Sequence, residues 1–398
     1  MPNQPTPIAT DRPLRVMFLI TSMPVGGAET LLMNLVRGMD RTRFLPEICC
    51  LKQPGPLGEA LEAELSVHSR LIHHKYDLRV LLRLRKLFCQ RQIDAVITVG
   101  AGDKMFWGRL AARLAGVPVV ISALHSTGWP DGVGRLNRLL TPWTDAFIAV
   151  AETHARFLVE LEKFPAEKVH TIHNGVDTNR FAPGNPKPVR RALGIALTAP
   201  IVGIVAALRS EKNHELFLQG AQKIVHKIPG AHFLVIGDGP RRDFLEQLAR
   251  KLDLTGAVHF LGSRDDIPQL LSACNVLALT SHNEANPVSL LEASSCGCPV
   301  VAAEVGSIRE TVTPGETGYL FPTGDTRAYV EAVLSLLKDP SLCLQLGSEG
   351  RRRVDRNWSL QGMVEGYQGL IASLHHAKQG LTKLPSPSAA SWAGTGLS

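Results

Sequence analysis

Two glutamates with seven residues between them, Glu284 and Glu292, offer the clearest combination of residue type and spacing for chemistry in this chain. Glu292 lies among apolar residues of a helical pattern, where a carboxylate without a partner costs several kcal/mol. The hydroxyls of a ribose would supply the hydrogen bonds that such a carboxylate needs. On the alternative interpretation, Glu292 merely faces solvent at one edge of the helix.

A helix start lies between these two glutamates. Asn286 is a favourable N-cap, Pro287 fits the first helical position, and Gly297 suits the position just past the helix end. The free N–H groups of Val288 and Ser289 would then face the end of the preceding strand. Because backbone N–H groups at a helix start attract anions, this segment predicts a phosphate site.

A glycine pair, Gly26 and Gly27, follows the first apolar run and precedes a helical pattern. Glycines let backbone N–H groups approach a ligand closely, and the helix start favours an anion there. The segment is neither a G-x-G-x-x-G dinucleotide motif nor a P-loop, since no G-K-[ST] follows. An ordinary tight turn is the alternative.

Short apolar runs alternate with amphipathic patterns along the chain, which predicts an α/β fold with parallel sheets covered by helices on both faces. Strands are expected at Leu14–Ile20, Glu47–Leu51, Ile93–Val99, Val117–Ile121, Asp145–Val150, Val169–Ile172, Ile201–Ala206, His232–Ile236, Val258–Leu261, Val276–Thr280 and Val300–Ala303. Helices are expected at Glu29–Gly38, Leu57–Leu65, Leu78–Gln90, Met105–Ala115, Thr153–Phe164, Glu215–Lys227, Arg241–Leu252, Ile267–Cys274, Pro287–Cys296 and Ser359–His376.

The 398 residues suit two domains better than one core. Phe181–Pro188, with three prolines in eight residues, is typical of a linker. We therefore expect Rossmann-like doubly wound domains at 1–182 and 183–358, a C-terminal helix at 359–378 that returns to the first domain, and a disordered tail at 379–398. Such sheets bind ligands at the carboxyl ends of their strands, here in a crevice between the domains.

Composition indicates a globular protein, with 44% hydrophobic and 20% charged residues. The longest early apolar run, Val16–Ile20, is too short to span a bilayer, and the Pro-rich start lacks the apolar core of a signal peptide. We therefore expect a cytoplasmic protein. The seven cysteines include no C-x-x-C pair, which predicts reduced and mostly buried thiols.

A basic segment lies within residues 68–91, where seven Lys and Arg side chains accompany a single acid, Asp77. Such a patch attracts a phosphorylated lipid, an acidic membrane surface or nucleic acid. A solvated helix face is the alternative. The basic residues are Arg70, Lys75, Arg79, Arg83, Arg85, Lys86 and Arg91.

The two glutamates, together with Ala293 and Cys296–Val301 after them, resemble the E-x7-E signature of a known family. This family is the retaining nucleotide-sugar glycosyltransferases of family 4, which have the GT-B fold. The likeness covers nearly the whole chain, with the motifs in the family's order. The other segments that look like family motifs are Gly26–Glu29, His173–Asp177, Glu211–His214, Gly237–Pro240, Phe260–Gly262 and Gly315–Gly318.

This resemblance implies a nucleotide-sugar site in the second domain. Glu292 would hold the ribose, Glu284 would lie by the transferred sugar, and Lys212 would neutralise the diphosphate. N–H groups of the loop after Glu284, at Ala285 and Asn286, would hold sugar hydroxyls. Backbone groups of Gly262, Ser263 and Arg264 would hold the base, and Gly237 would line the same pocket.

For the first domain, the resemblance implies the acceptor side. Gly26 and Gly27 would approach the diphosphate from there, and His125 matches the family's histidine near the sugar. His173–Asp177 would act as part of a hinge.

The chain departs from the family pattern G-R-L-x-x-E-K, because Ala207 stands where the family commonly has arginine. Arg209 follows two residues later and would face the same way on an extended segment. It therefore either replaces the family's arginine or is a surface residue.

The expected function is retaining transfer of a hexose-type sugar from a UDP- or GDP-linked donor to a glycan or lipid-linked acceptor. The product would belong to cell-surface polysaccharide or glycolipid synthesis, with peripheral membrane contact through residues 68–91 and no nucleic-acid partner. The sequence has no Asp-x-Asp pair, so we expect neither a metal nor a further cofactor. A sugar-nucleotide epimerase of the same fold and a non-catalytic nucleotide-sugar-binding protein are the alternatives.

Overall fold

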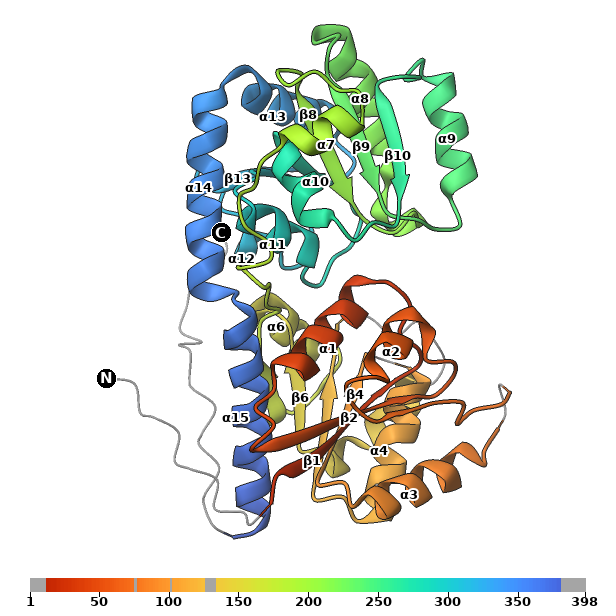
Figure 1. Cartoon of the computed structure of the whole chain (residues 1–398). Helices are drawn as coiled ribbons and strands as arrows, with labels where there is room; N and C mark the ends of the chain where they lie inside the picture. The colour runs from red at the N-terminus through yellow and green to blue at the C-terminus, as the bar shows by residue number, and fades with distance from the viewer. Residues whose placement is uncertain (1–11, 75–76, 101, 126–133, 381–398) are drawn as a thin grey trace. The chain divides into compact units, whose positions relative to one another are not determined.

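The computed structural model describes residues 12–74, 77–100, 102–125 and 134–380, and the chain divides into two compact units (Figure 1). The first contains Met1–Pro24, Leu32–Ile172 and Val364–Ser398, and the second contains Val25–Leu31 and His173–Met363. The division at Ile172/His173 comes earlier than the expected boundary at 182/183. The tail predicted to be disordered lies, from residue 381 on, outside the described residues.

Parallel strands form the sheet of the first unit, in the order β3-β2-β1-β4-β5-β6-β7 (Figure 1). They are β1 (Leu14–Ile20), β2 (Phe44–Cys50), β3 (Val67–His68), β4 (Ala95–Val99), β5 (Val119–Ala123), β6 (Ala146–Ala149) and β7 (Val169–Thr171). The sequence predicted all of them except β3, which is too short to show a pattern. β5 begins at Val119 instead of Val117, since Pro118 has no N–H to donate to a sheet.

Helices cover this first sheet. They are the part of α1 (Gly27–Gly38) from Leu32 on, α2 (Gly55–Leu61), α3 (Val80–Arg91), α4 (Asp103–Ala115), α5 (Gly134–Leu139), α6 (Glu152–Glu160) and the greater part of α15 (Leu360–Lys378), with short 3-10 turns at Thr141–Trp143 and Ala166–Lys168. Leu84 and Phe88 of α3 pack in one core cluster with Met17 and Leu19 of β1. In α15, Ile371 is fully buried, as the amphipathic pattern requires.

The second unit holds a parallel sheet in the order β10-β9-β8-β11-β12-β13. Its strands are β8 (Ile201–Val205), β9 (His232–Ile236), β10 (Val258–Gly262), β11 (Val276–Leu279), β12 (Val300–Ala303) and β13 (Gly318–Phe321). The sequence predicted no strand at β13, and the family motif Gly315–Gly318 overlaps it only at its first residue.

Two core clusters lie against this second sheet. One joins Phe217, Leu245 and Tyr329, from α8 (His214–Lys227), α9 (Arg242–Lys251) and α13 (Thr326–Lys338). The other joins Leu270 and Leu291, from α10 (Ile267–Ala273) and α11 (Val288–Ser295). The remaining helices are α7 (Lys187–Ala192), α12 (Ile308–Thr311) and α14 (Pro340–Asn357). α7 begins inside the expected linker, because its prolines occupy helix-start positions where no N–H is needed.

Each sheet has one point where the strand order reverses. In the first unit it lies between β1 and β4, and in the second between β8 and β11. The loops that leave neighbouring strands there diverge to opposite faces of the sheet, which leaves room for a ligand at the carboxyl ends. The candidate site of the second unit should therefore involve the loops after β8 and β11.

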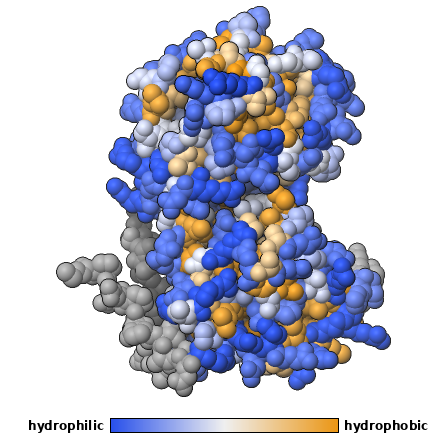
Figure 2. Space-filling model, in the orientation of Figure 1, coloured by the Kyte–Doolittle hydropathy of each residue, from blue (hydrophilic) through white to orange (hydrophobic). Residues whose placement is uncertain are grey.

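The surface and the thiols agree with the composition. On the visible face of each unit, apolar residues are interspersed with hydrophilic ones (Figure 2). Among the described helices, none combines the length and apolarity that a bilayer crossing requires. All the cysteines are free, and Cys89 on α3 is exposed whereas the others are buried or partly buried.

Candidate functional site

An ion pair joins the loops that flank the switch point of the second sheet. Lys212 ends a 3-10 turn, η3 (Ser210–Lys212), after β8, and Glu284 lies in the loop after β11. Lys212 Nζ lies 2.6 Å from Glu284 Oε1, and Ser281 Oγ donates to the same oxygen at 2.7 Å. The Glu284 side chain is only 9% exposed, so little water screens this pair. Two predicted catalytic residues are thus brought together.

Hydrogen bonds between the two loops hold this pair in place. Thr280 Oγ1 donates to the carbonyls of Asn213, at 2.9 Å, and Lys212, at 3.1 Å. The N–H of His282 donates to the carbonyl of Glu211 at 2.8 Å. The backbone of the lysine loop is therefore fixed to the strand end that carries the glutamate.

A third loop packs against the backbone of Glu284. Gly306 has a φ of +56°, and a Cβ built on it would overlap the carbonyl oxygen of Glu284. The next residue, Ser307, donates its hydroxyl to the carbonyl of Ala285. Position 306 therefore requires glycine for two reasons: its backbone is left-handed, and the carbonyl of Glu284 lies where a side chain would begin.

Helix α11 starts later than the sequence analysis predicted. The N-cap is Pro287, with extended backbone, and the helix begins at Val288, so the prediction of Asn286 as N-cap and Pro287 as first helical residue was wrong. Asn286 is instead buried, and its carbonyl accepts a hydrogen bond of 3.0 Å from Asn174 Nδ2, which holds it outside the helix. Val288 and Ser289 still form the first turn, whose N–H groups have no partner within the helix.

Glu292 lies half-buried in the middle of α11. Burial raises the pKa of its carboxyl from 4.5 to about 7, against the opposing effect of the nearby cation of Arg180. Leu291 and Ala293 on either side are fully buried. This carboxylate therefore has the apolar surroundings that the sequence analysis expected, and a hydrogen-bonding ligand would relieve its cost.

The predicted base loop lies at the ends of β9 and β10. The N–H of Gly237 donates to the carbonyl of Gly262 at 2.9 Å, and both glycines have positive φ, +136° and +68°. Ser263 and Arg264 are exposed, and Arg264 Nη2 lies 2.7 Å from an oxygen of Asp266. The loop is therefore braced at the two glycines and exposed at Ser263 and Arg264.

Arg209 lies on the lysine loop but at its surface. Its side chain is 62% exposed, and its Nη1 lies 4.0 Å from Glu211 Oε1. Nothing in this geometry distinguishes a phosphate-binding cation from a surface residue. Its role therefore stays a prediction.

The first unit carries His125, whereas the glycine pair belongs to the second unit, although the resemblance placed Gly26 and Gly27 on the first domain. His125 follows β5 and is half-buried, and burial, with the nearby charges of His154 and Lys104, lowers its pKa to about 4. The ring is therefore neutral at pH 7. Gly26 directly precedes α1 and Gly27 begins it, two residues before the predicted helix start at Glu29.

Several residues of the site were missed by the sequence analysis. Ser281 and Ser307 contact the glutamate loop through their hydroxyls, and Arg180 acts on Glu292 from the segment that follows the hinge motif. A Ser directly after an apolar strand is a signal that could have identified Ser281. The other two contacts join segments far apart in the sequence.

The basic segment of the first unit is less available than its composition suggests. Arg83 donates to both oxygens of Asp77, at 2.9 and 3.1 Å, and Arg91 forms an ion pair of 2.9 Å with Glu47. Lys75 lies outside the described residues. The segment therefore offers fewer uncommitted cations than predicted.

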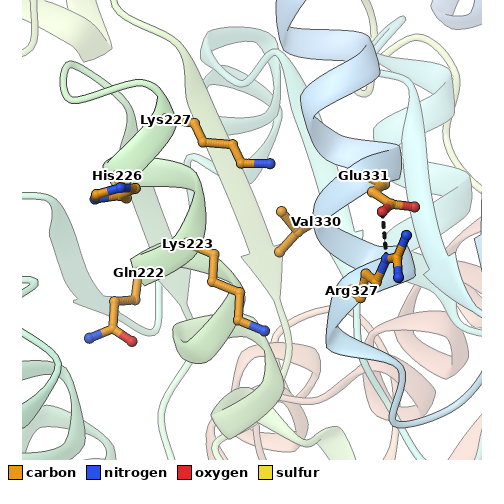
Figure 3. A pocket seen from close by; sticks show the side chains of 7 residues that line it. All are labelled: Gln222, Lys223, His226, Lys227, Arg327, Val330 and Glu331. Atoms are coloured by element: carbon orange, nitrogen blue, oxygen red, sulfur yellow. Dashed lines mark hydrogen bonds and ion pairs between the residues drawn. The ribbon is translucent and has the colours of Figure 1, made fainter.

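A groove of about 560 Å³ lies elsewhere in the second unit, between α8 and α13 (Figure 3). Lys223 and Lys227 reach from α8 toward Val330, and Arg327 pairs with Glu331 on α13. It contains none of the predicted site residues, so it is separate from the candidate site. Among the described residues, no group of three or more His, Cys, Asp and Glu side chains is placed to hold a metal ion.

Comparisons with known proteins agree with this geometry. The model of Glycosyltransferase Family 4 matches residues 25–180, and that of Glycosyl transferases group 1 matches residues 187–353. The chain is 31% identical over 317 residues to EpsF of Bacillus subtilis (strain 168), a protein assigned to the glycosyltransferases, covering 76% of this chain and 81% of that one.

Two further proteins extend the comparison. An Escherichia coli UDP-Gal:alpha-D-GlcNAc-diphosphoundecaprenol alpha-1,3-galactosyltransferase is 28% identical over 87% of this chain and 96% of its own. The crystal structure of Anabaena Alr3699/HepE in complex with UDP-glucose superposes with a TM-score of 0.80 at 22% identity, covering 90% of this chain and all of that one. The likeness confirms the predicted GT-B fold.

Replacing Gly306 by alanine tests whether close packing positions Glu284. Gly315→Ala is the matched control, because Gly315 also has positive φ, +78°, but nothing within 4 Å of a built Cβ. We expect Gly315→Ala to lose about 1 kcal/mol of stability from backbone strain, and Gly306→Ala to lose more, because its Cβ would also overlap the carbonyl oxygen of Glu284. Only Gly306→Ala should also lose turnover of nucleotide sugar, by tenfold or more as an order of magnitude. Equal turnover in the two variants would contradict this account.

Proposed function

Because the chain belongs to the family 4-type glycosyltransferases, we propose that it transfers a hexose-type sugar from a nucleoside-diphosphate sugar to a glycan or lipid-linked acceptor, with retention of configuration. The observation that carries the proposal is the ion pair of Lys212 with Glu284 at the switch point of the second sheet, next to the start of α11. Relatives that act on lipid-linked acceptors support the acceptor class. The products would belong to cell-surface polysaccharide or glycolipid synthesis.

Lys212 would stabilise the departing diphosphate. Negative charge grows on the phosphate as the glycosidic bond breaks, and a fixed cation in a poorly solvated site lowers that barrier. The Lys212 side chain is 24% exposed, which keeps its ammonium accessible while Glu284 Oε1 holds it. The first-turn N–H groups at Val288 and Ser289 would share this role.

Glu284 would orient the transferred sugar, with N–H groups of Ala285 and Asn286 on the sugar hydroxyls. In a retaining reaction the acceptor attacks on the face that the diphosphate leaves, and the leaving phosphate takes the acceptor proton. The cations and N–H groups would neutralise the diphosphate without a metal. We propose His125 as a further catalytic residue, and Arg209 as a donor-binding one.

The nucleotide would be held by Glu292 at the ribose and by the loop of Gly262, Ser263 and Arg264 at the base, beside Gly237. The half-buried carboxylate of Glu292 supports this, because ribose hydroxyls would satisfy it. UDP and GDP donors fit this description equally.

Replacing the lysine tests the proposed function directly. We expect purified protein to release nucleoside diphosphate from a UDP- or GDP-sugar, and Lys212→Ala to lower kcat/KM roughly 100-fold through loss of charge stabilisation. The rate of nucleotide release checks this, with Lys223→Ala in the α8–α13 groove as control. Formation of an epimerised nucleotide sugar in the absence of any acceptor would support the epimerase instead. No turnover by wild type with any donor would indicate a binding protein.

The pKa of Glu292 leads to a second prediction. A carboxylate accepts hydrogen bonds from ribose hydroxyls, so nucleotide affinity should fall as the pH drops below about 7, the pKa of the ligand-free protein. Glu292→Gln should bind nucleotide weakly at every pH. It should also raise the melting temperature of the ligand-free protein at pH 8, because the raised pKa means that the charged form destabilises the fold there. Calorimetry and thermal unfolding measure the two effects, and a destabilised Glu292→Gln would refute the assignment.

We also propose that α3 contacts an anionic membrane surface. Leu78 and Leu82, one helical turn apart, are 71% and 66% exposed, and the neighbouring Arg79, Arg85 and Lys86 are exposed as well. Apolar side chains flanked by cations favour insertion at a lipid headgroup layer. An acceptor that is lipid-linked or anionic would then be held near the enzyme.

Vesicle flotation tests this contact. Because each basic residue near an anionic surface contributes about 1 kcal/mol, Arg79→Gln/Arg85→Gln/Lys86→Gln should lower binding to phosphatidylglycerol vesicles roughly 100-fold. Neither the wild type nor this variant should bind phosphatidylcholine vesicles. Lys227→Gln/Arg250→Gln/Lys251→Gln, on α8 and α9, removes the same three positive charges from exposed positions and is the control for net charge. The idea is wrong if the α3 variant floats as well as that control.

A further inference from the structure

Arg180 is fixed by its own segment after the hinge motif. Asp177 Oδ1 accepts hydrogen bonds from the N–H groups of Asn179, at 3.0 Å, and Arg180, at 3.1 Å. The guanidinium lies over the ring of Phe181, 5.3 Å from its centroid. Phe181 is buried, so the arginine rests on a rigid platform.

This platform is attached to the helix that carries Glu292. The carbonyl of Phe181 accepts hydrogen bonds from Ser295 Oγ, at 2.5 Å, and from Arg351 Nη1, at 3.1 Å. Ser295 is the last residue of α11, and Arg351 of α14 also donates to its carbonyl. Arg180 is therefore held in a defined position relative to α11.

The side chain of Arg180 then reaches the predicted base loop. Its Nη2 donates to the carbonyl of Asp265 at 3.3 Å, directly after Arg264. An arginine carries several donors in a planar fork, and a single bond of this length leaves most of them available. One exposed cation thus connects the base loop with the segment bound to α11.

The same cation acts on Glu292. Arg180 is the charged neighbour whose effect opposes the burial of this carboxyl and lowers its pKa. The other titratable group coupled to Glu292 is the Cys296 thiol on the same helix, which Arg351 of α14 also affects. The base loop contributes Arg264, which is paired with Asp266. Arg180 is therefore the residue whose removal should change the charge state of Glu292.

We propose that Arg180 is a positioning residue of the nucleotide site, where it joins the base loop at Asp265 to the Glu292 helix and places a cation beside that glutamate. The inference rests on the proposed function and adds a residue to it. Arg180 would act by holding the loop in register with α11 and by keeping the carboxylate ready to accept hydrogen bonds.

Calorimetric titration with UDP and with GDP at pH 6, 7 and 8 tests this role on the full-length protein. We expect Arg180→Gln to weaken the binding of whichever nucleotide binds wild type by about fivefold at pH 7, because a one-unit rise in the pKa of Glu292, which is about 7, lowers its ionised fraction by about that factor at this pH. The loss should be larger at pH 6 than at pH 8. Without the cation of Arg180 the pKa of Glu292 rises, and this removes a larger share of the ionised carboxylate below the pKa than above it. Arg180→Lys should recover part of the affinity by restoring the charge.

Arg327→Gln is the control for the loss of one exposed arginine, since Arg327 is exposed and pairs with Glu331 on α13, away from the candidate site. A purely structural role would lower the melting temperature and weaken binding equally at all three pH values, which would overturn the proposal. Wild-type affinity in Arg180→Gln would overturn it too. If wild type binds neither UDP nor GDP, the proposed function falls and this inference with it.

Discussion

The contact between Lys212 and Glu284 is the interaction on which the rest of the site depends. It spans the two strands between which the second sheet reverses its order, so each partner comes from a different half of the unit. An ammonium at this point would otherwise take many orientations, and fixing it beforehand removes that entropic cost from ligand binding. Three residues hold the pair in this position: Thr280 and Ser281 through hydrogen bonds of their hydroxyls, and Gly306 by leaving room for the backbone of Glu284.

Glu292 differs from this pair, because its charge is disfavoured in the ligand-free protein. Burial raises the pKa of its carboxyl, so the ligand-free fold is less stable with the charge than without it. In the proposed site, ribose hydroxyls would relieve this cost. The site would then combine a preorganised cation with a partly desolvated carboxylate, and stability would be traded for affinity at one residue.

Much of this arrangement could be predicted from the sequence, because it depends on local patterns. Apolar runs located the strands, and two residues that the family resemblance predicted as catalytic, Lys212 and Glu284, lie in contact. The start of α11 was misplaced because Asn286 has the local character of an N-cap but is bound by Asn174, more than a hundred residues away. The effect of Arg180 on Glu292 was missed for the same reason, since tertiary contacts leave no periodic signal.

The distribution of thiols has a practical consequence. Burial raises the pKa of Cys50, Cys274 and Cys296 to about 12, so these sulfurs stay protonated and inert toward electrophiles. Cys89, in contrast, is exposed on the outer helix α3. A maleimide dye would therefore attach there in preference, without any engineered cysteine, and its emission would report on whatever approaches that helix.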